Sequence, residues 1–252
     1  MFRRPRSTEP DPVALHVGHV LKPMPVMLWG GQAMYFLGAP IVLGLYMIVV
    51  QDEDYQLAIK KLLDSGFQLS KPRRESAPEV LESLPDPQTV IDEINAGYRR
   101  VDEDSTTFDF PESSQTEEQL TLLPNSFVHL PPVNDLRYLK EYVPYDNLWY
   151  PCERALASSF VQATMDDEDI NKYSLWVDVL RSWIGFMPNY LEVNNDIFDY
   201  WEFLDSRAKE WYSTHYGRAR EAKYGPWDRR ISKRIGSSKE MPVGARGNPL
   251  ER

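Results

Sequence analysis

Residues 23–51 form a run that contains no charged side chain. Charged residues make up 26% of the whole chain, so an uncharged run of this length strongly constrains the fold. Lys22 lies directly before the run, and three acidic residues at positions 52–54 follow it. The run is either one membrane-spanning helix or the buried middle of a small α/β domain.

The membrane interpretation rests on the length of this run. A helix of about twenty apolar residues spans a bilayer, and residues 26–50 exceed that length. Basic residues before the run and acidic residues after it also fit the orientation rule for membrane helices. Three prolines and four glycines interrupt the run, which opposes one straight helix. A single membrane anchor at residues 26–50, and with it a membrane-associated protein, is the alternative rather than the main prediction.

The second interpretation divides the run into regular elements of a buried layer. It predicts a strand at 26–29, a tight turn at Gly30 and Gly31, a short helix ending at Gly38, and a second strand at 41–50. An amphipathic helix then follows from residue 55 to Gly66. The absence of charge is what strands buried on both faces require.

This order of elements resembles a known superfamily. The pattern h-h-W-G-G-x-A-x-x-x-x-G-x-P, followed by an apolar strand, an amphipathic helix and "SGF", is similar to the nucleotidyltransferase superfamily, and more closely to a group of fungal nucleotidyltransferase-like proteins. The resemblance implies an α/β (α+β) fold with a small mixed sheet and an accessory C-terminal helical half. It also implies that turn amides hold a nucleotide, and that an Asp-x-Asp pair on the second strand binds Mg²⁺, which activates the attacking oxygen.

The residues of the chain match this pattern only in part. The turn is Gly30-Gly31, which the resemblance assigns to nucleotide or anion binding. The Asp-x-Asp positions fall near Leu45 and Met47, whose side chains cannot ligate Mg²⁺. The third acid of the family has one isolated candidate, Asp109. We therefore expect a catalytically degenerate protein without a metal site, acting as a binding or accessory factor, with a biosynthetic pathway as a compatible setting.

The alternative function is an active nucleotidyltransferase that takes its carboxylates from other positions. Asp109 and the acidic residues at 102–104 are the candidates. This alternative predicts at least two carboxylates facing the Gly30-Gly31 turn, and only in this case are Mg²⁺ and a nucleotide expected as cofactors.

A second short motif, at His16-x-Gly18-His19, is similar to the H-I-G-H signature of class I aminoacyl-tRNA synthetases. In that family the motif follows a strand and opens a helix. The preceding residues do not have the pattern of a strand, and Pro23 limits any helix that follows. We therefore expect a surface segment, and no metal site at the two histidines, because further ligands are missing nearby.

The sequence as a whole predicts four regions. They are a lead-in at 1–22, the α/β core at 23–150 with a polar insert at about 70–125, a helical half at 151–224, and a basic flexible tail at 225–252. Within them we expect a strand at 126–132 that carries His129. The four acidic residues at 166–169 are expected in a solvated turn between two helices. Aromatic residues at helical spacing in 176–212 are expected in the core.

Composition limits the partners. The net charge of −10 makes nucleic acid an unexpected partner for the body of the protein, because phosphate binding requires clustered basic residues. The single cysteine, Cys152, excludes an internal disulfide, and the N-terminal arginines lack the apolar segment of a signal peptide. We therefore expect a cytoplasmic protein whose partner is another protein, with the basic tail contacting an acidic surface.

Overall fold

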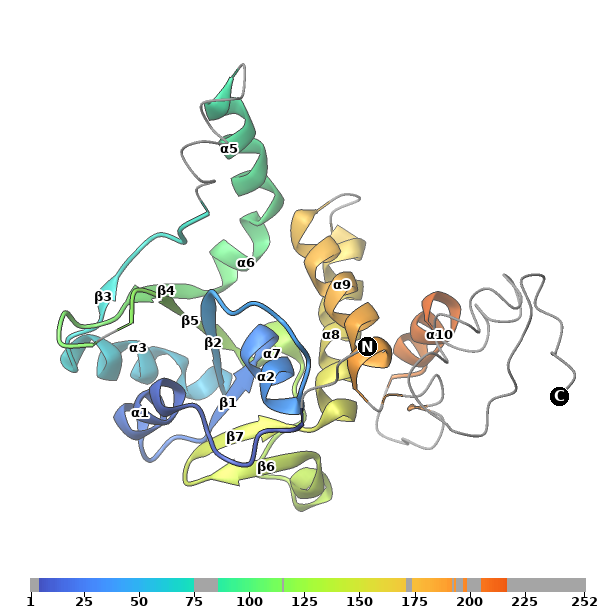
Figure 1. The fold of residues 1–252 in the computed structure, drawn as a ribbon, viewed down its shortest axis with the longest axis horizontal. Coiled ribbons are helices and arrows are strands. Elements are labelled where there is room, and N and C mark those ends of the chain that lie inside the picture. The colour runs from blue at the N-terminus through green and yellow to red at the C-terminus, as the bar shows by residue number, and fades with distance from the viewer. Residues whose placement is uncertain are drawn as a thin grey trace, which may run out of the picture.

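A computed structural model of the chain describes residues 5–74, 86–114, 116–170, 174–191, 193, 197–198 and 205–216. Its centre is a seven-stranded sheet (Figure 1). The strands are β1 (Val26–Trp29), β2 (Leu45–Val50), β3 (Gln68–Leu69), β4 (Thr106–Asp109), β5 (Gln119–Pro124), β6 (Tyr142–Tyr145) and β7 (Leu148–Pro151).

The sheet is mixed, and its order is β3-β4-β5-β2-β1-β7-β6. Strand β1 pairs antiparallel with β2 and parallel with β7, while β2 pairs parallel with β5. The outer pairs β3–β4, β4–β5 and β6–β7 are antiparallel. Together with the helices of the C-terminal half, this sheet confirms the α+β fold class.

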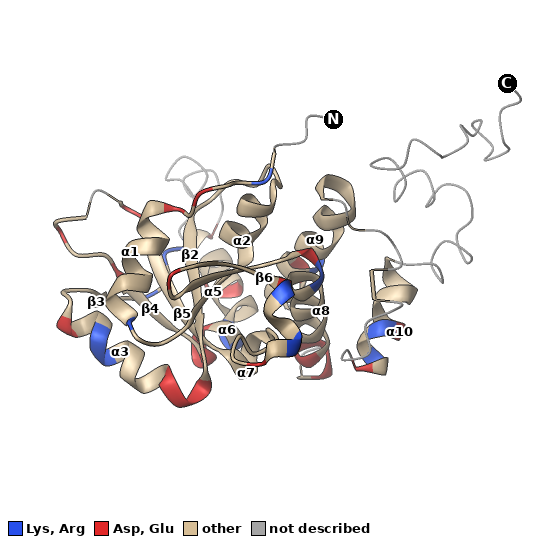
Figure 2. Ribbon diagram, turned by 90° about the horizontal axis from the view of Figure 1, so that it is seen from below, with Lys and Arg blue, Asp and Glu red and all other residues tan. Residues whose placement is uncertain are grey.

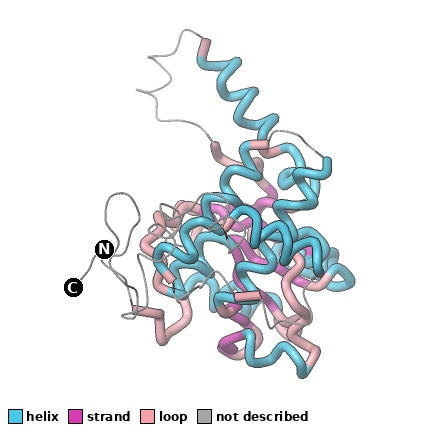
Figure 3. The backbone as a smooth tube through the Cα atoms, turned by 90° about the vertical axis from the view of Figure 1, so that its right-hand side faces the viewer, coloured by secondary structure: helices cyan, strands magenta, loops and turns pink. Residues whose placement is uncertain are grey.

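The helices are α1 (Pro12–Leu21), α2 (Gly30–Leu37), α3 (Tyr55–Asp64), α5 (Pro87–Gly97), α6 (Arg99–Asp104), α7 (Asn125–Val128), α8 (Glu153–Ile170), α9 (Leu175–Tyr190) and α10 (Ser206–His215), with 3-10 turns η1 (Asp52–Asp54) and η2 (Leu136–Glu141). Helices α1 and α3 contact each other on one side of the sheet, and α8 and α9 pack together on the other side (Figure 2). Helix α5 extends away from the body of the molecule (Figures 1 and 3).

The uncharged run folds as strand, helix and strand, as the second interpretation predicts. Helix α2 ends at Gly38, which has a left-handed backbone with φ of 105° and donates its N–H to the carbonyls of Met34 and Tyr35. Strand β2 begins at Leu45 rather than at position 41. The run does not form the single helix that the membrane interpretation requires. In the described ranges, no helix has both the length and the apolar character needed to cross a membrane.

The helical half shares one core with the sheet. Trp29 at the end of β1 is completely buried, and its indole N–H donates to the Ser159 hydroxyl of α8 at 2.7 Å. The Trp29 ring contacts Phe160 of α8 and Trp183 of α9, with ring centroids 5.3 and 5.9 Å apart. The expectation that the C-terminal aromatic residues lie in the core is confirmed at Trp176 and Tyr212, which are buried.

Several expected elements differ from the structure. Within the insert at 70–125, the sequence predicts a helix at 87–101 and a strand at 106–111, which α5, α6 and β4 confirm, but it does not predict the sheet strand β5. The expected strand at 126–132 is wrong, since its first residues form α7 and His129 ends that helix with a left-handed φ of 56°. The acidic residues at 166–169 belong to α8 rather than to a turn. The lead-in at 1–22 contains α1, and the basic tail at 225–252 lies outside the described residues.

Candidate functional site

The Gly30-Gly31 pair opens α2 rather than forming a separate turn. Gly30 is buried, with φ of 64°, and a Cβ built on it would lie 2.7 Å from the Met47 sulfur and 3.1 Å from the Trp183 ring. A Cβ built on Gly31 would have Ile41 and Leu43 as its nearest neighbours, at 3.8 and 3.9 Å. The atoms nearest to the two Cβ positions are thus apolar, and not the two carboxylates that an active transferase predicts.

Strand β2 places the two Asp-x-Asp positions over a cavity. Leu45 and Met47 are two residues apart, so their side chains point to the same face of the sheet. In the parallel pair with β5, Leu45 lies opposite Gln119 and Met47 lies opposite Thr121. These four side chains form the base of a cavity of about 170 Å³.

The walls of this cavity, which we call the β2–β5 cavity, come from distant parts of the chain. Strands β2, β4 and β5, with the residues directly before β2 and β5, contribute Gly44, Leu45, Met47, Thr107, Glu117, Glu118, Gln119 and Thr121. The chain between β3 and β4, together with α9, contributes Pro72, Arg73, Arg74, Tyr98, Val101, Asp102, Ser105 and Trp176. The cavity is therefore closed by a segment whose sequence predicts a polar linker and a helix.

The Arg73 guanidinium on this wall already has an ion-pair partner and a hydrogen-bond acceptor. It forms an ion pair with Asp109 at 2.5 Å, and its second Nη donates to the Glu117 carbonyl at 3.0 Å. Gln119 also donates to Asp109, at 2.9 Å. Burial would raise the pKa of Asp109, but hydrogen bonds from Gln119, Ser70 and Arg73 outweigh it and hold that pKa below its usual range. Asp109 is thus an ion-pair partner, and a catalytic role for it remains only a prediction.

The next residue, Arg74, forms a bidentate ion pair. Both of its Nη atoms donate to the two carboxylate oxygens of Asp102, one of them at 2.6 Å. Its guanidinium also lies over the Tyr98 ring, 4.2 Å from the centroid. A bidentate pair of this kind fixes the guanidinium in one orientation. Arg74 and Tyr98 therefore form a rigid wall of the cavity.

The remaining polar groups of the cavity include the side chains of Glu117 and Glu118, two threonine hydroxyls and one indole. One carboxylate oxygen of Glu118 is buried and has no hydrogen-bond partner among the described residues. The Thr107 and Thr121 hydroxyls lie 3.3 Å apart, and both residues are buried. Trp176 is 3% exposed, and its indole N–H has no acceptor among the described residues. A buried donor without a partner is rare in folded proteins, which makes it a marker of a ligand or water position.

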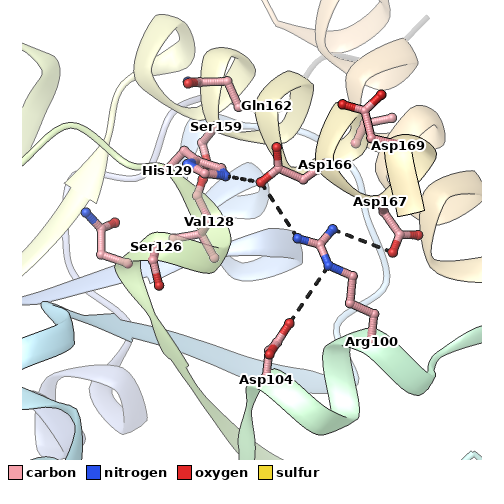
Figure 4. Close-up of polar contacts among 12 residues, drawn as sticks. Arg100, Asp104, Ser126, Val128, His129, Ser159, Gln162, Asp166, Asp167 and Asp169 are labelled. Atoms are coloured by element: carbon pink, nitrogen blue, oxygen red, sulfur yellow. Dashed lines mark hydrogen bonds and ion pairs between the residues drawn. The ribbon is translucent and has the colours of Figure 1, made fainter. Parts of the chain in front are cut away.

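A second polar cluster joins α6, α7 and α8 (Figure 4). The Arg100 guanidinium lies 3.5 Å from Asp167, 3.7 Å from Asp166 and 3.8 Å from Asp104. His129 Nε2 lies 2.6 Å from the Asp166 carboxylate. Because Asp167 is fully buried and Arg100 also packs over the Phe127 ring at 5.1 Å, we interpret the cluster as a structural connection between helices.

The other candidate residues occupy separate places. His16 and His19 lie within α1, and residues 5–10 before that helix form no strand, so the context of the synthetase motif is missing. His19 instead lies 3.3 Å from Asp146. Cys152 accepts from Arg6 at 3.4 Å, and burial raises the pKa of its thiol.

The donor set does not fit the metal ions that the resemblance implies. Leu45 and Met47 offer no oxygen ligand at the two central positions, and Mg²⁺ requires oxygen ligands. Within the part of the chain that the structure describes, no group of three or more His, Cys, Asp or Glu side chains is arranged to hold a metal ion.

Sequence patterns missed most of the cavity. Arg73 and Arg74 lie in a Pro- and Ser-rich stretch whose composition predicts a linker, and Trp176 has the spacing of a core residue. Leu45 and Met47 had a signal in the sequence through the superfamily pattern, and Asp102 had one as a member of the acidic candidates at 102–104. The lining residues are up to 132 residues apart in the sequence, and hydrophobic periodicity does not predict contacts between such distant residues.

Comparison with known proteins gives little further constraint. No protein-family model matches the chain, and no curated protein matches it. A solved crystal structure of JHP933 from Helicobacter pylori is similar, with a TM-score of 0.39 and 10% sequence identity, over 90% of this chain and 94% of that chain. A similarity at this level carries no argument about function, so the functional conclusion depends on the cavity itself.

Proposed function

We propose that the protein is a catalytically degenerate, nucleotidyltransferase-like binding or accessory factor that uses the β2–β5 cavity to hold a small ligand. The observation that carries the proposal is the position of Leu45 and Met47. They occupy the two strand positions where the resembled superfamily holds its metal-binding acids, and they line a cavity there. A protein that keeps the cavity without metal ligands has the means to bind and lacks the means to activate a phosphate.

Two further observations support binding over catalysis. The atoms nearest to a Cβ built on Gly30 or Gly31 belong to apolar side chains, and no carboxylate is among them. Two of the carboxylate candidates already have partners, since Asp109 is paired with Arg73 and Gln119, and Asp102 is paired with Arg74. A Mg²⁺ ion at Asp109 would have to displace the guanidinium, with no second acid supplied by β2.

A nucleotide-transfer assay tests this proposal. Purified protein incubated with Mg²⁺ and labelled ATP, GTP, CTP or UTP should transfer no label to itself or to added RNA, protein or small hydroxyl-bearing acceptors. In a parallel titration, Mg²⁺ should not enhance the binding of ATP. Magnesium-dependent transfer that disappears in Asp109→Ala and persists in Asp169→Ala, an exposed carboxylate of α8, would establish the active transferase instead.

A further inference from the structure

The lining of the β2–β5 cavity carries more acidic than basic side chains. It contains two arginines, and each of them already has a carboxylate partner. It also contains Glu117 and Glu118, and no ion pair among the described residues involves either of these two carboxylates. The charge that the ion pairs leave over is therefore negative. A cavity lined by an excess of one charge favours a ligand of the opposite charge.

Glu118 has an oxygen that the described part of the protein does not satisfy. This carboxylate oxygen is buried and has no hydrogen-bond partner among the described residues. Burial, and after it the negative charge of Asp11, raise the pKa of the Glu118 carboxyl, whereas a cationic partner would lower it. A cationic group that carries N–H donors would supply both the hydrogen bond and the compensating charge.

A second buried group of the lining requires an acceptor instead. Trp176 of α9 is 3% exposed, and its indole N–H has no acceptor among the described residues. An indole nitrogen can only donate, so a cationic group cannot satisfy it and a carbonyl oxygen can. The lining therefore requires two different groups, a cationic donor for Glu118 and an acceptor for Trp176.

We propose that the β2–β5 cavity binds a small organic cation, whose ammonium or amidinium group pairs with Glu118 and whose carbonyl accepts from the Trp176 N–H. Glu117, which is exposed, adds negative charge that attracts such a cation from solvent. The cavity volume of about 170 Å³ suits a single ring with short substituents rather than a nucleoside triphosphate. This inference rests on the proposed binding function and defines its ligand class.

Three probes of nearly the same shape isolate the effect of charge. They are 3-(aminomethyl)benzamide, 3-(hydroxymethyl)benzamide and 3-carbamoylbenzoate, which are cationic, neutral and anionic at pH 7 and share one carboxamide. Binding to the full chain is measured by ligand-observed NMR and by calorimetry. The cationic probe should bind about tenfold more tightly than the neutral probe, and the anionic probe should bind more weakly than both. Benzylamine, which lacks the carboxamide, should bind about fivefold more weakly than the cationic probe.

Variants locate the two interactions. Glu118→Gln keeps the size of the side chain and removes its charge, so the cationic probe should then bind no more tightly than the neutral probe. Glu53→Gln, at an exposed glutamate of η1 outside the cavity lining, should leave the preference unchanged. Trp176→Phe removes the N–H donor and should weaken both probes about fivefold. If Glu118→Gln does not fold, Glu117→Gln provides the second variant and should reduce the preference for the cation about twofold.

The outcomes separate this inference from the proposed function. A neutral probe that binds as tightly as the cationic probe, with loss of binding in Leu45→Phe at the base of the cavity, would overturn the cationic ligand and keep the binding function. Tightest binding of the anionic probe would do the same. A preference for the cation that survives Glu118→Gln would overturn the assigned partner. Failure of every probe to bind the folded protein would overturn the ligand class, and magnesium-dependent nucleotide transfer would overturn the binding function as well.

Discussion

Gly30 shows how one residue joins the sheet to the helical half. Its φ of 64° is a conformation that glycine adopts freely and that side chains resist. The same position lies against the Met47 sulfur on one side and the Trp183 ring on the other. The glycine is therefore required by both the turn of the backbone and the close approach of α9, without any need for a bound nucleotide.

Alanine substitution tests this interpretation. Gly30→Ala should lower the free energy of unfolding by about 1–3 kcal/mol, because it combines a strained backbone with a Cβ inside contact distance of Met47. Gly31→Ala is the matched control, since its Cβ would meet its nearest neighbour at 3.8 Å and its φ is not positive. The measurement is urea unfolding followed by circular dichroism. Equal effects of the two variants would contradict the packing explanation.

At the residue scale, the sequence predicts which chemical groups are present better than it predicts which residues contact one another. The missing acids at Leu45 and Met47 follow directly from residue identity within a strand pattern. The pairing of Arg74 with Asp102 does not, because it depends on how the chain between β3 and β4 returns to the sheet. The sequence also does not predict that the Trp176 N–H lacks an acceptor among the described residues, since helical spacing indicates only that the side chain is buried.

Helix α8 shows why charge patterns mislead at the scale of elements. Four consecutive acids predict a solvated turn, yet they extend α8 to Ile170. Successive residues of a helix point in different directions, so the four side chains meet four different surroundings. Asp167 is buried beside Arg100, whereas the Asp169 side chain is 64% exposed and pairs with Arg207.

Neutral substitutions distinguish these two surroundings. Asp167→Asn should lower the free energy of unfolding by about 2 kcal/mol, because it removes a buried partner of the Arg100 guanidinium. Asp169→Asn should change it by less than about 0.5 kcal/mol, since exposed ion pairs contribute little. Chemical denaturation of both variants in one buffer gives the comparison. A loss at Asp169 as large as at Asp167 would show that burial does not set the difference.

The elements that were predicted correctly are those with strong local periodicity. The strand, helix and strand of residues 26–50 and helix α3 follow from apolar spacing and from the glycines at their ends. Strand β5 was missed because its six residues follow a polar stretch and end at Pro124, which suggests a loop. Helix α7 was missed because its four residues are too short for a helical period to be recognised.

At the scale of the whole molecule, the sheet and the helices α8 and α9 form one hydrophobic core. Trp29 of β1, Phe160 of α8 and Trp183 of α9 contact one another, and the Trp29–Ser159 hydrogen bond crosses the same boundary. The expected division at residue 150 is therefore not a gap in the packing. Unfolding one part exposes apolar surface of the other.

This continuity predicts cooperative unfolding of the described parts. Tryptophan fluorescence, which reports on the aromatic cluster, and far-ultraviolet circular dichroism, which reports on all helices, should give the same midpoint in urea. Trp29→Ala should shift both midpoints together and lower the free energy of unfolding by about 3–5 kcal/mol. Two separated transitions in the unmodified protein would show instead that the halves are independent.

The two sides of the β2–β5 cavity have different origins in the chain. Its base is part of the hydrogen-bonded sheet, where register leaves little freedom to change. Much of its opposite wall belongs to the one segment that connects the neighbouring strands β3 and β4. Replacing the single segment between β3 and β4 would therefore be the direct way to alter what the cavity binds. The scaffold beneath would stay intact, and new selectivity would be obtained without redesigning the protein.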